Sequence, residues 1–221
     1  MSMSMLLVCA LLGSAAGNVE KLVFTGPPPS IASPALPPFQ LNTLTHDDLS
    51  VRTALDRIFA SGQTGHGHSS WLLLTNLTQS QRYELRVCWS ALEPTRFDME
   101  AYTLDAVLEK PKLLRSLSSY MASRPGAQTE KQLSRSSSLL VEIYAAADYF
   151  TDDARLMDSP PPVLVDLILD PFLFNVVPQS LLPTLGYLAL LSITTWFVAR
   201  RAASRLRSVA DQAETPVKKQ D

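Results

Sequence analysis

Cysteine is scarce in this chain of 221 residues, which limits how the fold can be stabilised. The two cysteines are Cys9 and Cys88. Because Cys9 lies in an N-terminal segment that we expect to be removed, no disulfide is expected within the mature chain. The domain then depends on its hydrophobic core or on a partner. We expect Cys88, which lies in an apolar run, to be a buried free thiol.

Sequence motifs of catalytic and cofactor sites are also missing. The chain has no Gly-x-Ser-x-Gly, no phosphate-binding loop, no dinucleotide fingerprint and no Cys-x-x-Cys. His66, His68 and His46 are too few ligands for a metal site. Asp166 and Asp170, four residues apart, would share the wet face of a helix. The sequence therefore predicts no catalytic residue, cofactor or metal.

A basic patch is absent as well. Lys and Arg together number 19 against 21 Asp and Glu, which gives a formal net charge of -2. The charges are mixed along the chain, and no basic stripe is available for phosphate contacts. This composition excludes nucleic acid as an expected partner.

One long stretch carries no Asp, Glu, Lys, Arg or His. It runs over residues 172–199 and is closed by Arg200 and Arg201. Within it we expect a transmembrane helix over residues 183–199, about 26 Å long at ~1.5 Å per residue, close to the ~27 Å thickness of the endoplasmic reticulum bilayer. Because flanking arginines stay cytosolic, the basic tail over 200–221 is predicted to be cytosolic and the preceding chain lumenal.

Both ends of the chain indicate the secretory pathway. Residues 1–17 have the layout of a signal peptide, an apolar run followed by small residues. Lys218 and Lys219 resemble the dilysine retrieval signal of type I residents of the endoplasmic reticulum. Asn76 begins the only Asn-x-Ser/Thr sequon, which is expected in a turn between two strands and glycosylated there. We therefore predict a single-pass type I protein of the endoplasmic reticulum membrane.

Between these ends the pattern predicts a mainly β, sandwich-like lumenal domain with one or two short helices. Residues 18–45 are expected to be a Pro-rich extended lead outside the sheets, and residues 46–170 the β-rich domain. In the best-defined strand, Tyr83–Trp89, alternate residues share one face. A helix is expected around residues 105–119, and residues 49–59 are compatible with either a helix or a strand. Leu77 followed by Tyr83 is an approach similar to the tyrosine corner of immunoglobulin-like sandwiches.

Two segments are candidates for contact with a partner. The juxtamembrane segment 171–182 is apolar but interrupted by proline, so it is expected on the membrane surface or against a partner protein. In the transmembrane helix, small and hydroxylated residues permit close approach of a second helix. The candidate residues are Phe172, Phe174, Asn175, Pro178, Gly186, Ser192 and Thr195.

Four strings of residues resemble one fungal family, the small accessory subunit (co-activator) of GPI mannosyltransferase II. They are Arg82–Trp89, Tyr102–Leu104, Ala145–Phe150 and Asn175–Leu181. The resemblance covers roughly residues 71–187. It implies a non-catalytic resident of the endoplasmic reticulum that binds a polytopic mannosyltransferase, the catalytic subunit that adds the second mannose to the GPI precursor.

Alternative functions remain open from the sequence. The stabilising subunit of GPI mannosyltransferase I has a similar topology, and sequence physics does not distinguish the two. A cargo adaptor cycling between endoplasmic reticulum and Golgi is a further alternative, although such proteins usually carry heptads before the membrane and none is visible here. An enzyme in its own right is the third.

Overall fold

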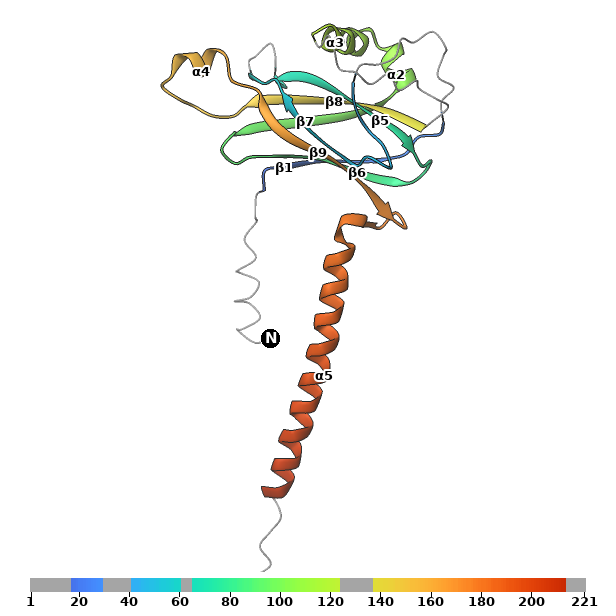
Figure 1. Cartoon of the computed structure of the whole chain (residues 1–221), viewed down its shortest axis with the longest axis vertical. Coiled ribbons are helices and arrows are strands. Elements are labelled where there is room, and N and C mark those ends of the chain that lie inside the picture. Colours follow the sequence, from blue (N-terminus) through green and yellow to red (C-terminus); the bar gives the residue numbers. More distant parts are fainter. Residues whose placement is uncertain (1–16, 30–40, 61–64, 124–136, 214–221) are drawn as a thin grey trace, which may run out of the picture.

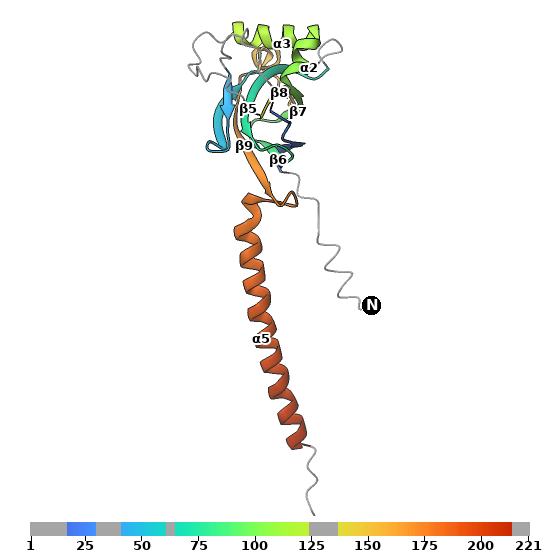
Figure 2. The same cartoon turned by 90° about the vertical axis from the view of Figure 1, so that its right-hand side faces the viewer.

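The computed structural model describes residues 17–29, 41–60, 65–123 and 137–213. Two five-stranded sheets pack face to face, two helices cover one of them, and a long helix leaves the domain on the opposite side (Figures 1 and 2). This arrangement confirms the predicted fold class, a mainly β domain with short helices and one long C-terminal apolar helix.

Sheet A is the layer nearer the long helix. It contains β1 (Val19–Thr25), β3 (Ser50–Leu55), β6 (Arg82–Trp89), β9 (Val163–Leu173) and β10 (Val177–Pro178). The predicted alternation in β6 is confirmed at its start, because Tyr83, Leu85 and Val87 have no exposed surface. They face the core, while Arg86 projects from the outer face of the sheet.

Sheet B is the layer below the two covering helices. It contains β2 (Asn42–Leu44), β4 (Ile58–Phe59), β5 (His68–Leu77), β7 (Thr95–Thr103) and β8 (Ser137–Ala147). β8 pairs with β5 on one side and with β7 on the other. Its inward residues, such as Val141 and Ile143, pack against β6 and β9 in the main core. The outward residue Leu140 belongs to a second apolar cluster under the helices.

The helix predicted around residues 105–119 is two helices. α2 (Leu104–Glu109) and α3 (Pro111–Ala122) are separated at Lys110, which has extended backbone. Pro111 lacks the N–H that a continuing helix requires, but it is well tolerated as the first residue of a new helix. Val107 and Leu117 are buried against Trp71 of β5, so the pair covers the outer face of sheet B.

The prediction that residues 18–45 lie outside the sheets is wrong at both ends of that segment. β1 pairs with β6 from Val19 to Thr25, and β2 pairs in parallel with β5. Gly26 explains how β1 fits, because a Cβ there would lie 2.1 Å from the carbonyl oxygen of Thr78. The prolines of this segment lie between the two strands, and neither β1 nor β2 contains one, so strand pairing is not interrupted.

Residues 49–59, which the sequence left open between a helix and a strand, form strands β3 and β4. Two further boundaries differ from the sequence prediction. β9 continues three residues past the predicted end of the domain at residue 170 and takes Phe172 into sheet A. After a short 3₁₀ turn, η1 (Gln179–Leu181), helix α5 runs from Leu182 to Ala213, well beyond residue 199. The small helix α4 (Ala154–Asp158) lies in the loop before β9.

The similarity to a tyrosine corner extends to its hydrogen bond. The Tyr83 hydroxyl accepts from the Thr78 backbone N–H at 2.9 Å and donates to Gln81 Oε1 at 3.1 Å. A conserved feature of immunoglobulin-like corners is a bond of this kind, from a strand tyrosine to the backbone a few residues upstream. Here it fixes the turn between β5 and β6 next to Gly26.

Candidate membrane junction and partner-binding surface

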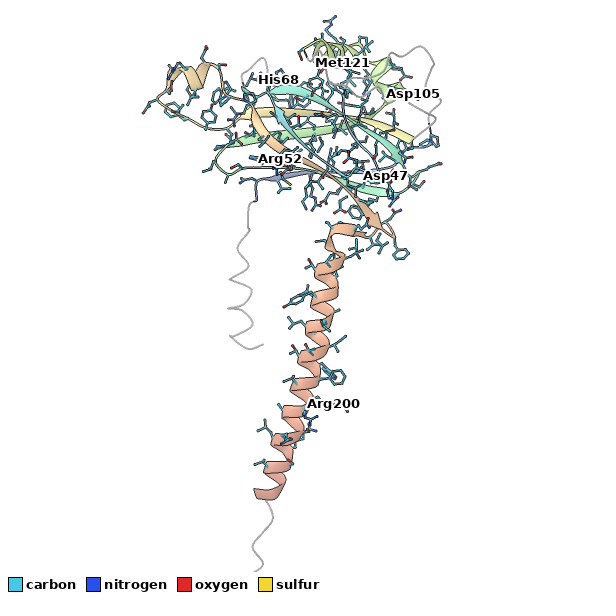
Figure 3. The ribbon with its side chains drawn as sticks, viewed as in Figure 1. Asp47, Arg52, His68, Asp105, Met121 and Arg200 are labelled. Atoms are coloured by element: carbon cyan, nitrogen blue, oxygen red, sulfur yellow. The ribbon has the colours of Figure 1, made fainter. Side chains whose placement is uncertain are left out.

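Helix α5 is, among the residues that the structure describes, the one helix long and apolar enough to cross a membrane. It has 32 residues, so it is about 48 Å long at ~1.5 Å per residue, more than the ~30 Å of a bilayer core. Its large side chains point outward with nothing packed on them, and Arg200 lies well along it (Figure 3). Leu190 is 61% exposed and Trp196 66%. Such surface in a soluble setting would be unfavourable.

One side of α5 has a shallow hollow. It is lined by Leu191, Ser192, Thr195, Trp196 and Ala199. The predicted candidates Ser192 and Thr195 therefore share a face. Gly186 does not belong to it, because nine residues separate it from Thr195, about two and a half helical turns. The Ser192 hydroxyl donates to the Leu188 carbonyl at 2.8 Å, so its remaining capacity toward a neighbour is as an acceptor.

The connection between sheet A and α5 is held by a buried acid. Asp170 on β9 is 4% exposed and pairs with Arg86 Nη2 at 3.1 Å. Its other oxygen accepts the Ser180 backbone N–H at 3.1 Å, the Ser180 hydroxyl also bonds to the carboxylate, and Arg86 reaches Ser180 Oγ at 3.3 Å. Ser180 lies in η1, immediately before the helix. The acid thus ties the start of α5 to β6 and β9.

The prediction that Asp166 and Asp170 lie on a solvated helical face is wrong in its secondary structure and, for the buried Asp170, also in its exposure. Both lie on β9, where the period of two places residues four apart on the same outer face of the sheet. Asp166 accepts from Arg52 Nε at 2.6 Å and Nη2 at 2.8 Å. This two-point hydrogen bond from Arg52 lowers the pKa of the Asp166 carboxyl below its ordinary value.

The turn between β9 and β10 has an unusual backbone. Phe174 and Asn175 have φ of 51° and 59°, and the Val176 N–H donates to the Leu173 carbonyl at 3.1 Å. Positive φ at both central residues is the requirement of a type I′ turn, which favours Asn and Gly and disfavours a bulky residue such as phenylalanine. The Asn175 side chain fixes the turn: Oδ1 accepts the Arg82 N–H at 2.8 Å and Nδ2 donates to the Ser80 carbonyl at 3.0 Å.

The four juxtamembrane candidates therefore differ in their exposure and contacts. Phe172 is 8% exposed and lies under the Arg82 guanidinium, 5.1 Å from the ring centre, so the prediction that it faces lipid or a partner is wrong. Pro178 pairs with Phe172 in β10, and Asn175 is occupied by its own turn. Phe174 alone is free, at 89% exposed.

Three exposed apolar residues that were not among the predicted candidates lie near Phe174 in the sequence. Leu173 is 42% exposed, Val176 72% and Leu181 46%. We call Leu173, Phe174, Val176 and Leu181 the junction patch. A sequence signal for it existed, because all four lie in the uncharged stretch that continues into α5.

Asn76 is exposed, but it does not lie in a turn as expected. It belongs to the last part of β5, with φ of 59°, at an irregularity in the pairing of β5 with β8 between Leu74 and Leu77. Thr78, the third residue of the sequon, is also exposed. A bulge at a strand end presents both side chains to solvent.

A buried polar cluster joins α3 to sheet B. Glu142 on β8 is 1% exposed, and its Oε1 accepts from the hydroxyls of Ser69 and Ser116, each at 2.6 Å. Trp71 Nε1 donates to Ser116 Oγ at 3.1 Å. Burial, together with the Glu142 carboxylate, raises the pKa of Tyr144. The cluster explains how α3 is fixed, and sequence reasoning missed it because its members come from three separate elements.

The remaining predicted residues have no role that the geometry assigns. Cys88 is free but only partly buried, so the expectation of a buried thiol is wrong, and desolvation raises the pKa of its thiol. His66 lies 3.6 Å from Asp98. Within the described ranges, no group of three or more His, Cys, Asp and Glu side chains could hold a metal. The signal-peptide residues 1–16 and the dilysine pair Lys218 and Lys219 lie outside the described residues.

Comparison with known proteins identifies no family for this chain. No protein-family model, curated protein or solved structure matches the chain.

Proposed function

We propose that the chain is a single-pass type I protein of the endoplasmic reticulum membrane. Its role is that of a non-catalytic subunit of a GPI mannosyltransferase, stabilising or positioning the polytopic catalytic subunit that adds the second mannose. The observation that carries the proposal is α5, whose apolar side chains are exposed from Leu182 to Val209 and whose preceding 3₁₀ turn is hydrogen-bonded to the sandwich. The apolar side chains of such a helix are buried by lipid and by the helices of another protein.

The hollow on α5 supports a helical partner. Ser192 and Thr195 are short, and Leu191 and Trp196 flank them, so a second helix can approach closely there and pack against the larger side chains. A polytopic enzyme offers many such helices. A partner that docked on this face would be oriented relative to the sandwich, because the junction leaves no linker between them.

Two of the four strings that carry the family resemblance meet at the junction. Arg82–Trp89 is β6, and Asn175–Leu181 is the turn, β10 and η1. Two hydrogen bonds join these strings, from the Arg82 N–H to Asn175 and from the Arg86 guanidinium to Ser180. The two bonded pairs, whose members are 93 and 94 positions apart in the chain, thus hold β6 against the segment that precedes α5. This supports a role in which the fixed orientation of the sandwich relative to α5 positions the partner.

Depletion of the protein tests the role. We expect accumulation of a GPI intermediate with one mannose, because the second transfer would fail. Accumulation of an intermediate without mannose would instead indicate a subunit of the first mannosyltransferase. Normal GPI synthesis would refute a role in either enzyme.

Co-purification from mild detergent tests the binding face. Replacing Ser192 and Thr195 by leucine fills the hollow, so we expect loss of the attached transferase. Gly186→Leu is the matched control, since it adds the same side chain on the opposite side, where a new Cβ meets nothing within 4 Å. Equal loss in both variants would show that the hollow is not the docking face.

Glycosylation tests the orientation. A lumenal sandwich carries Asn76 in the compartment where glycans are added, so we expect one glycan sensitive to endoglycosidase and absent from Asn76→Gln. An epitope placed after residue 221 is expected to be accessible from the cytosol in permeabilised cells with intact internal membranes. The opposite accessibility would invert the topology.

A further inference from the structure

We propose that the turn between β9 and β10 inserts Phe174 into the headgroup region of the bilayer, which gives the sandwich a second membrane contact beside α5. The ligand is lipid, and the contact surface is the junction patch. This inference rests on the proposed function in one respect, the membrane span of α5.

The first argument is chemical continuity. From Pro171 to Ala199 the chain has no Asp, Glu, Lys, Arg or His, so the junction patch and the apolar part of α5 belong to one uncharged stretch. Phe174 is 89% exposed and Val176 72%, so both side chains are available to a surrounding medium. Burial of such side chains in an interface is favourable by ~25 cal/mol per Å².

The second argument is position. β9 points toward the start of α5, and the turn that follows it lies beside the first residues of the helix in both views (Figures 1 and 2). Ser180, which precedes the helix by two residues, is fixed to Asp170 on β9. If the hydrocarbon begins near Pro183, then the turn lies at the depth of the lipid headgroups on the side of the sandwich.

The third argument is backbone strain. A phenylalanine at φ of 51° costs free energy, of order 1–3 kcal/mol for a non-glycine residue in this region. Asn or Gly would form the same turn without that cost. No burial within the described fold offsets it. An aromatic side chain held outward at such a turn is explained if its surroundings are the membrane interface, where aromatic residues are favoured.

Arg82 adds a cation beside the turn, which suits a lipid headgroup. It is exposed, its guanidinium stacks 5.1 Å over the Phe172 ring, and its backbone N–H is bound by Asn175 of the turn. Arg82 thus places a cation on the strand that is bonded to the turn, while the turn carries the exposed Phe174. A cation and an apolar side chain on one surface can contact lipid phosphate and the acyl boundary together.

The two membrane contacts act as one unit. The Asp170–Arg86–Ser180 network fixes η1, which leads directly into α5, and the two side-chain bonds of Asn175 fix the turn between β9 and β10. A single helix leaves a domain free to tilt on the bilayer. A rigid second contact removes that freedom and holds the outer face of sheet A toward the lipid, with α2 and α3 on the side away from it.

Nitroxide labels at single cysteines measure the depth directly. The background is the full chain with Cys9→Ser and Cys88→Ser, reconstituted without any partner in vesicles of palmitoyl-oleoyl-phosphatidylcholine. Labels are placed at Phe174→Cys, at Phe150→Cys (Phe150 is 83% exposed and lies before α4) and at Leu190→Cys in α5. Collisions with oxygen and with a water-soluble nickel chelate are compared. Val176→Cys is a fourth variant that retains Phe174.

At position 174 we expect collisions with the chelate to be about ten-fold rarer than at position 150, because a polar solute is excluded from the acyl boundary. Position 176 is expected to give the same result. If positions 174 and 176 match position 150 while 190 is protected, the inference is overturned and the membrane span stands. Protection at 174 that arises only after a transferase is co-reconstituted also overturns it, in favour of a protein contact. Chelate access at 190 would overturn the span itself.

Discussion

The sandwich and helix α5 contain the same kinds of apolar side chain in opposite surroundings. Leu85 in β6 has no exposed surface, whereas Leu190 in α5 is 61% exposed. In the sandwich, two sheets and two helices of one chain bury each other's apolar faces. Along α5 no described element packs on the helix. The hydrophobic effect stabilises the first region from within, and the second region depends on what surrounds the molecule.

The junction between these regions is neither a flexible linker nor a simple extension of the helix. Its polar groups bond inward, to Asp170, Arg86 and Arg82, while its apolar groups project outward. This division explains why the same short segment can be rigid and still offer an apolar surface. Four predictions test how the two regions and the junction between them are stabilised.

The largest difference is expected between leucines. Leu85→Ala removes a core side chain and leaves a cavity, so the free energy of unfolding of the sandwich should fall by about 3 kcal/mol. Leu190→Ala should leave that free energy unchanged, because the side chain contacts no part of the sandwich. Chemical denaturation of the full chain in detergent, followed by near-ultraviolet circular dichroism, measures both. Equal effects would contradict the independence of the two regions.

The next difference is expected between arginines. Arg86→Met leaves the buried Asp170 carboxylate without its cation, which should cost about 2 kcal/mol. Arg155→Met removes an exposed pair with Asp153, whose nitrogen–oxygen distance is 3.5 Å, and should cost nothing measurable. The same denaturation experiment compares them. A negligible effect of Arg86→Met would show that the network does not hold the junction.

A smaller difference separates two asparagines with the same backbone. Asn76 and Asn175 both have φ of 59°, but Asn175 also makes two side-chain hydrogen bonds. In unglycosylated protein, Asn175→Ala should therefore destabilise the fold more than Asn76→Ala, by about 1 kcal/mol. The backbone preference for asparagine cancels in the comparison. An equal loss of stability in the two variants would mean that the Asn175 bonds contribute nothing.

The smallest effect is expected at the exposed pair of Arg52 and Asp166. Because Arg52 lowers the pKa of Asp166, the pair adds stability at pH values above the ordinary carboxyl pKa of 3.8, and this stability is lost as the pH falls through the lowered value. In Arg52→Met the pKa of Asp166 should rise toward 3.8. Carboxyl carbon shifts followed by NMR measure it. An unchanged titration would show that the pair does not form in solution.

The core strands could be predicted from local pattern, but one long strand could not. In β6 the alternation of Tyr83, Leu85 and Val87 gave the strand and its buried face. β7 also alternates, with Phe97 inward, but its Arg, Asp and Glu residues have low strand propensity. It is a strand because it pairs with β8 along its whole length. Pairing with a partner about 40 positions away is invisible in a local window.

The candidate site was predicted as a segment but not residue by residue. Absence of charge over residues 172–199 indicated the apolar helix and its approach. It did not distinguish Phe172 from Phe174, two identical residues two positions apart, because that distinction depends on strand pairing. The placement of Gly186 and Thr195 on opposite sides of α5 follows from their nine-residue spacing once the helix is assigned.

The sequence by itself determined what depends on neighbours along the chain: the period of β6, the proline that begins α3, and the uncharged stretch that becomes α5. Tertiary structure alone decided what depends on distant residues. Arg86 and Asp170 are 84 positions apart, and Arg82 and Asn175 are 93 apart. Their bonds place Phe172 inside and leave Phe174 outside, because a hydrogen bond or a buried ion pair forms only where the fold brings its two partners together.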